Sequence, residues 1–230
     1  MPPSRWYPPI LAVFVTTLVI SNIIAVKLIS VFGITLPAAV ILFPVTYIFG
    51  DVLTEVYGYA RARQSIWIGF ACNLLAVVAI WIGGILPADA IWTADLYTSP
   101  LEASIAYQAI LGFTPRLLMA SFLAYLIGEF LNALVLAKLK VASRGRFLWI
   151  RTIASTLIGQ GVDSAIFISI AFFGILPASI MGTTIISQWL FKSGYEAIAT
   201  PLTYGIVNAL KRAEGVDFFD RETDFSPVKF

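Results

Sequence analysis

The chain has 230 residues, of which 59% are hydrophobic and 12% are charged, and its formal net charge is +2. A soluble domain carries about 25% charged residues, so this composition excludes an ordinary soluble globular protein. The small net charge gives no indication of a nucleic-acid partner. The absence of histidine excludes His-based catalytic groups and metal ligands, and the single cysteine excludes a disulfide or a cysteine metal site within the chain.

Long apolar stretches dominate the rest of the sequence. A membrane-spanning helix needs about 20 mostly apolar residues. The first stretch begins after Arg5 and runs uncharged from Trp6 to Val26, which is too long for the apolar region of a signal peptide. Six stretches meet the requirement, and we predict spans at 8–28, 36–57, 64–86, 116–137, 152–176 and 180–209. The shorter segment 103–113 follows a polar loop and is predicted to be interfacial or re-entrant.

The basic residues predict the orientation of these spans. The loops 29–35, 87–115 and 177–179 carry no Lys or Arg, whereas the alternate connections and both terminal segments are basic. Six spans with both termini in the cytoplasm satisfy the positive-inside rule in every loop. The predicted fold class is therefore all-α, a polytopic membrane helical bundle with six transmembrane helices in a single domain, 1–230.

Three acidic residues, Glu129, Asp163 and Glu196, lie deep inside apolar stretches. A charged side chain at the bilayer centre costs roughly 2.5–3.5 kcal/mol on insertion scales, so such residues usually have a function. Glu129 and Asp163 are expected at similar depth on neighbouring helices, facing each other across a central cavity. The alternative is that each forms a structural hydrogen bond between helices, with Gln160 or Asn132 as partner.

Helix two carries a second polar stripe. Tyr47, Asp51 and Glu55 are spaced by four and share one face. Pro44 precedes them and is expected to kink the helix and to free a backbone carbonyl near the site. The alternative is a structural role, in which the two carboxylates only cap the cytoplasmic end of the helix.

Cationic side chains also occur within the spans. Lys27 and Arg116 lie near helix ends, where they could snorkel to the interface or serve the site. Lys192 lies too deep for snorkelling. It is expected either to pair with Glu196 one turn away or to donate to a substrate.

A short internal echo links helices four and five. Two six-residue segments share one pattern: a glycine, an acid or amide, two further residues, an acid or amide, and a small residue. They are Gly128-Glu129-Phe130-Leu131-Asn132-Ala133 and Gly159-Gln160-Gly161-Val162-Asp163-Ser164. Adjacent spans run antiparallel, so the echo fits an inverted arrangement of the kind found in transporters, although chance also explains so short a match.

The second predicted span contains the run Phe43-Pro44-Val45-Thr46-Tyr47-Ile48-Phe49-Gly50-Asp51-Val52-Leu53-Thr54-Glu55-Val56-Tyr57-Gly58-Tyr59. This run resembles the queuosine precursor transporter family, a bacterial branch of the vitamin uptake transporters. The upstream run from Ser21 to Lys27 is also similar to the family's first helix. The resemblance implies a multi-pass protein of the bacterial inner membrane. It would import 7-cyano-7-deazaguanine, 7-aminomethyl-7-deazaguanine or both, for queuosine modification of tRNA.

That substrate suits a polar interior. A carboxylate can accept hydrogen bonds from the adjacent N–H and amino groups of a guanine-like edge, and amides or lysine can donate to its carbonyl and ring nitrogen. The candidate substrate-binding residues are the polar side chains of the spans, namely Asn22, Lys27, Tyr47, Asp51, Glu55, Glu129, Asn132, Gln160, Asp163, Lys192 and Glu196. The expected partners are the deazaguanine and the lipid bilayer, without nucleic acid, cofactor or metal. A homodimer remains an open option.

Two other functions compete with a secondary transporter, which could be coupled to protons through a buried carboxylate. The first is a substrate-binding membrane subunit of an ATP-driven vitamin-type uptake system. This chain itself has no G-x-x-x-x-G-K-[ST] phosphate loop. The second is an intramembrane aspartyl protease using Asp51 and Asp163. The run Gly159 to Asp163 has one residue too many for the Gly-x-Gly-Asp pattern of that class, so we expect no enzyme activity.

Overall fold

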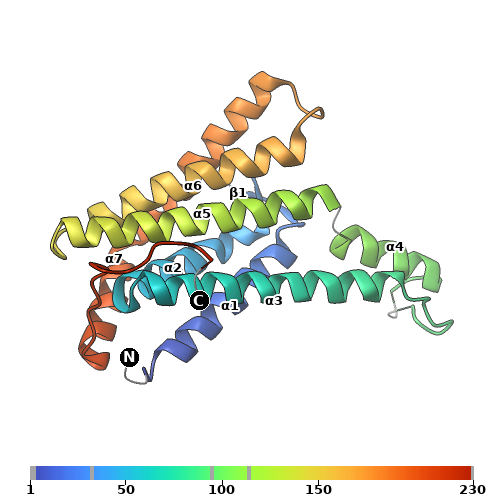
Figure 1. Cartoon of the computed structure of the whole chain (residues 1–230). Coiled ribbons are helices and arrows are strands. Elements are labelled where there is room, and N and C mark those ends of the chain that lie inside the picture. The colour runs from blue at the N-terminus through green and yellow to red at the C-terminus, as the bar shows by residue number, and fades with distance from the viewer. Residues whose placement is uncertain (1–3, 32–33, 94–95, 113–114, 229–230) are drawn as a thin grey trace.

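The structure, a computed structural model, describes residues 4–31, 34–93, 96–112 and 115–228. Its long helices are α1 (Tyr7–Ile24), α2 (Phe43–Tyr57), α3 (Tyr59–Ile85), α5 (Pro115–Ala142), α6 (Leu148–Phe172) and α7 (Ala178–Glu214). Each corresponds to one predicted span, so the helical bundle expected from hydropathy is present (Figure 1). Four helical stretches, 7–24, 59–85, 100–142 and 148–172, are long and apolar enough to cross a membrane by length and composition.

The predicted span 36–57 is wrong in its first part. A hairpin of two short antiparallel strands, β1 (Leu28–Val31) and β2 (Ile34–Pro37), precedes a 3₁₀ turn, η1 (Ala38–Ile41), and α2 begins only at Phe43. Pro44 therefore lies in the first turn of α2 and does not kink it. Proline fits there because the first helical N–H groups have no intrahelical acceptor.

The segment predicted to be interfacial or re-entrant forms a helix, α4 (Pro100–Leu111), while residue 113 lies outside the described residues. The Ser99 side chain accepts a hydrogen bond from the Glu102 backbone N–H at 3.3 Å, and Glu102 accepts one from the Thr98 N–H. Reciprocal bonds of this kind satisfy free donors at a helix start. Tyr107 and Gln108 then donate to carbonyls of α3, which fixes α4 against the end of that helix.

Helix α2 is central to the bundle, because it contacts α1, α3, α5 and α7. Helices α5 and α6 run side by side along most of their length, and α7 packs on α6 (Figure 1). Gly128 and Gly159 make the α5–α6 crossing close. A Cβ atom added at Gly159 would lie 2.8 Å from the Asn132 Cβ, and one added at Gly128 would lie 2.9 Å from the Asp163 Cβ. The two echoed segments thus meet each other.

The burial pattern suits a lipid environment. Large apolar side chains such as Leu75, Trp81 and Ile198 are 63–80% exposed, whereas many polar side chains are buried between helices. Such an arrangement is expected where the solvent is hydrocarbon and the interior is functional.

Both terminal segments lie at the same end of the bundle. The Ser4 hydroxyl and the Trp6 backbone N–H donate to the Glu214 carboxylate at 2.7 and 2.6 Å. The α2–α3 junction and the α5–α6 loop lie at this end as well (Figure 1). We call it the basic end, because it holds the basic residues of these connections.

Candidate functional site

The candidate site is a layer of buried polar side chains from α2, α5, α6 and α7. Asp51 and Asn132 form its first pair, in which the Asn132 amide donates to Asp51 Oδ1 at 2.8 Å. Both side chains are buried, and Asp51 Oδ2 and Asn132 Oδ1 have no hydrogen-bond partner among the described residues. This pair joins the predicted stripe of α2 to the echoed segment of α5.

Lys192 and Asp163 form the second pair, which links α7 to α6. The ammonium lies 2.5 Å from Asp163 Oδ2, and Tyr47 of α2 also hydrogen-bonds Lys192. The expected pairing of Lys192 with Glu196 is therefore wrong. Asp163 lies on α6, which packs against α7. Lys192 therefore pairs with a residue of the neighbouring helix and not with Glu196 on its own helix.

Glu196 occupies an unusual position in the layer. It is 1% exposed, and neither of its carboxyl oxygens accepts a hydrogen bond from any residue that the structure describes. Asp51 and Glu129, two other acidic residues of the layer, each interact electrostatically with Glu196. A buried polar group without a partner is rare in native proteins and calls for an explanation.

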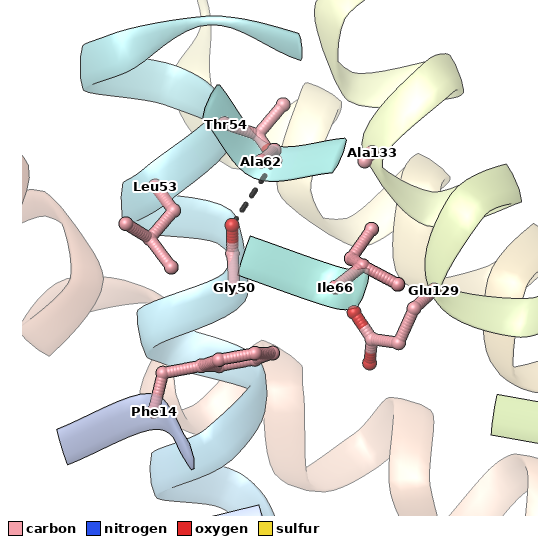
Figure 2. A pocket seen from close by; sticks show the side chains of 8 residues that line it. All are labelled: Phe14, Gly50, Leu53, Thr54, Ala62, Ile66, Glu129 and Ala133. Atoms are coloured by element: carbon pink, nitrogen blue, oxygen red, sulfur yellow. Dashed lines mark hydrogen bonds between the residues drawn. The ribbon is translucent and has the colours of Figure 1, made fainter. Parts of the chain in front are cut away.

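Glu129 lines a small cavity between α1, α2, α3 and α5. Figure 2 shows its carboxylate directed toward the space bounded by Gly50, Phe14 and Ile66. The volume of this cavity is about 10 Å³, roughly the space of a single water molecule. Glu129 also interacts electrostatically with Asp163, but Asp163 is neutralised by Lys192, so the two carboxylates do not form an isolated pair across an open cavity.

The third residue of the α2 stripe, Glu55, belongs to the basic end. Its Oε1 lies 2.8 Å from Arg151 Nη2, 2.7 Å from Lys211 Nζ and 3.6 Å from Lys140 Nζ. Glu55, Arg151 and Lys140 are at most 2% exposed. Sequence reasoning missed Arg151 and Lys140, because both lie between the predicted spans 116–137 and 152–176. In the structure α5 continues to Ala142 and α6 begins at Leu148, so both residues lie inside helices.

A C-terminal strap, residues 215–228, covers this ion cluster. Asp217 lies 2.6 Å from Lys140 Nζ and 2.9 Å from Lys211 Nζ. Desolvation acts to raise the pKa of Asp217, but the hydrogen bonds from Lys140 and Lys211 outweigh it and hold that pKa below its ordinary value. Further along, Asp220 accepts from the Tyr59 backbone N–H at 3.0 Å. The strap thus ties α5 and α7 to the α2–α3 junction.

Three other candidates lie apart from the paired residues. Asn22 donates to Asn73 at 3.1 Å and joins α1 to α3, and Lys27 is exposed beyond the end of α1. Gln160 is buried in α6, and its Oε1 has no hydrogen-bond partner among the described residues. The structure therefore brings Tyr47, Asp51, Glu129, Asn132, Asp163, Lys192 and Glu196 together and leaves Asn22, Lys27 and Glu55 outside this layer. Gln160 is buried in α6 and belongs to neither pair. Among the described residues, no group of three His, Cys, Asp or Glu side chains is arranged to hold a metal ion.

Comparisons with known proteins agree with a transport site. The family described as "Putative vitamin uptake transporter" matches residues 37–206. A "Probable queuosine precursor transporter" of Bacillus subtilis (strain 168) is 32% identical over 187 residues, which cover 81% of this chain and 78% of that protein. No solved structure matches the chain. The matched region contains α2, α5, α6 and most of α7, and so includes the whole polar layer.

Proposed function

Because this chain belongs to the vitamin uptake transporter family, we propose that it imports queuosine precursors across the bacterial inner membrane. The substrates would be 7-cyano-7-deazaguanine, 7-aminomethyl-7-deazaguanine or both. The single observation that carries the proposal is the 32% identity, over 187 residues, to a protein named as a probable queuosine precursor transporter. The substrate would cross without chemical change.

The polar layer supports a heterocyclic substrate. It contains acceptors in Asp51, Glu129 and Glu196, and donors in Lys192 and Tyr47. A guanine-like base has both donor and acceptor groups on its edge, and buried polar groups without a partner are satisfied when a ligand supplies one. Lipid-facing helices around a polar layer are the usual plan of a site for carrying a polar molecule across a membrane.

The conformation described here suits an occluded state. The cavity beside Glu129 measures about 10 Å³, whereas pockets for small molecules span about 300–1,000 Å³. We propose that substrate enters and leaves by alternating access, and that the cluster of Glu55, Arg151 and Lys211 closes the cytoplasmic end in this state. Opening that end would require these ion pairs to separate.

We also propose that uptake is secondary and coupled to protons. The layer holds four carboxyl groups, those of Asp51, Glu129, Asp163 and Glu196, and one ammonium group, that of Lys192. Carboxyl groups close together in a low-dielectric interior resist simultaneous ionisation, so the layer is suited to holding a proton. Asp163 is already paired with Lys192, which leaves Asp51, Glu129 and Glu196 as the candidates.

Purified chain reconstituted alone into lipid vesicles tests this function. Labelled 7-cyano-7-deazaguanine or its aminomethyl form would be offered with and without an imposed proton gradient. We expect accumulation that depends on the gradient, because no second protein should be required. Binding without uptake would favour the membrane subunit of an ATP-driven system, and no binding of either compound would contradict the proposal.

A further inference from the structure

The carboxylates between these helices differ in how completely their oxygens are satisfied. Glu55 is surrounded by three cations, Asp163 by one, and Asp51 accepts from an amide. Glu196 has neither a cation nor a hydrogen-bond donor on either oxygen among the described residues, although it is 1% exposed. Among the described residues, it is the carboxylate whose two oxygens are both buried and without a hydrogen-bond partner.

The fold supplies no compensation to Glu196 from its own helix. The hydroxyl of Thr200, one turn along α7, donates to the Glu196 backbone carbonyl at 2.8 Å and not to its carboxylate. Lys192, one turn before, is held by Asp163 on α6. A carboxylate placed in this way is stabilised by a ligand that brings two adjacent N–H donors, because an ionised carboxylate can accept them on its two oxygens.

A guanine-like base carries such a pair of donors, the ring N1–H and the 2-amino group. Building on the proposed function, we propose that Glu196 is the specificity-determining residue for this edge, accepting N1–H on one oxygen and the 2-amino group on the other. The unpartnered Oδ1 of Asn132, held in place through Asp51, lies in the same layer as a further acceptor. Glu196 would then select deazaguanines over bases that lack the 2-amino group.

This assignment predicts a selectivity that the unaltered protein must show. Binding of 7-cyano-7-deazaguanine would be compared with binding of 7-cyano-7-deazahypoxanthine, which lacks only the 2-amino group. Titration of the purified protein in detergent measures both affinities without any need for transport. We expect the analogue to bind at least about tenfold more weakly, because one buried carboxylate oxygen would stay unpaired. Equal affinities would overturn the assignment.

The variant Glu196→Gln provides a sharper test, since an amide accepts one hydrogen bond and donates one. It should therefore match the edge of 7-cyano-7-deazaxanthine, in which a carbonyl replaces the 2-amino group. We expect the ratio of affinities for deazaguanine and deazaxanthine to fall by about tenfold or more, the size expected for one well-aligned pair of hydrogen bonds. Glu222→Gln, the same change at an exposed position of the strap, should leave the ratio as in the unaltered protein.

The outcomes separate this inference from the function on which it rests. If the unaltered protein binds no deazaguanine, the proposed function fails. If it binds deazaguanine and Glu196→Gln keeps the original ratio, the function stands and the role of Glu196 is wrong. Should Glu196→Gln not fold, equal affinities of the unaltered protein for deazaguanine and deazahypoxanthine would still overturn the assignment.

Discussion

Lys192 of α7 reaches across to Asp163 of α6 and pairs with it at 2.5 Å, while Glu196, one turn further along the same helix, has no hydrogen-bond partner among the described residues. Both members of the pair are 18% exposed, so it is largely withdrawn from solvent. Lys192, the ammonium group that the described residues contribute to the polar layer, is thus committed to Asp163. That choice of partner determines which acids remain available for substrate and proton.

The first prediction concerns this pair. Removing one partner of a largely buried ion pair costs about 3–5 kcal/mol, because the other charge is left uncompensated. Asp163→Asn and Lys192→Met should each lower the unfolding temperature in detergent, and the double variant should be more stable than either single one. If the two single effects simply add, the side chains are not coupled. Lys192→Met with Glu196→Gln serves as the control and should show no such rescue.

The second prediction concerns the ion cluster of the basic end. Glu55→Gln should destabilise the protein strongly, since it removes the one buried charge that faces Arg151, Lys140 and Lys211. Asp217→Asn changes a side chain that is 45% exposed, where ion pairs contribute less than about 1 kcal/mol. Thermal unfolding of both variants compares the two positions. A larger effect at Asp217 than at Glu55 would refute this ranking.

The third prediction concerns the contact between the strap and the α2–α3 junction. Gly58 has φ +83°, and a Cβ atom there would lie 2.3 Å from the Phe218 ring. Gly58→Ala should therefore displace the strap and make it more sensitive to protease, because the new methyl group overlaps the ring and the backbone is strained. Gly205→Ala is the matched control, since nothing lies within 4 Å of its added Cβ. Equal protease sensitivity of the two variants would contradict the predicted contact.

The fourth prediction is a pH dependence of the strap. The pKa of Asp217 in the folded protein lies below its ordinary value, so the stabilisation by its charge is complete above the ordinary pKa of about 3.9 and is lost as the pH falls through the folded value. The protection of residues 215–228 from hydrogen exchange, relative to an unfolded chain at the same pH, should fall below about pH 4. Asp217→Asn should flatten this response. An unchanged profile in that variant would assign the acid sensitivity to other groups.

The fifth prediction concerns topology. The two terminal segments meet at the basic end through Glu214, and the positive-inside rule places such an end in the cytoplasm. A reporter fused after Phe230 should therefore report a cytoplasmic location, and one inserted near Asp89 should report the exterior. A C-terminal reporter found outside would contradict the proposed orientation.

The sequence alone determined the long helices of the bundle and indicated several of the polar residues buried between them, such as Asp51, Glu129 and Glu196. Hydropathy is a local property of each stretch, so the positions of the long helices followed directly, and the basic loops predicted that both termini lie at one end. The run around Asp51 and Glu55 also indicated the family that the comparisons then showed. The start of α2 was misplaced, because residues 36–42 are apolar like a span but form the end of β2 and the η1 turn.

Only the tertiary structure decided the partners. Residues four apart on one helix share a face, and on α2 Tyr47 and Asp51 do lie in the polar layer. Glu55, on the same face, lies in the ion cluster of the basic end. A pair between Lys192 and Glu196, one of the two expected alternatives, is not formed among the described residues. A long side chain can instead contact the neighbouring helix, and which neighbour it meets depends on how closely the helices cross and where each one ends. The close α5–α6 crossing at Gly128 and Gly159 and the contact of α6 with α7 bring Asp163 to Lys192. The extension of α5 to Ala142 brings Lys140 to Glu55. These contacts join residues far apart in the chain, so no local pattern records them.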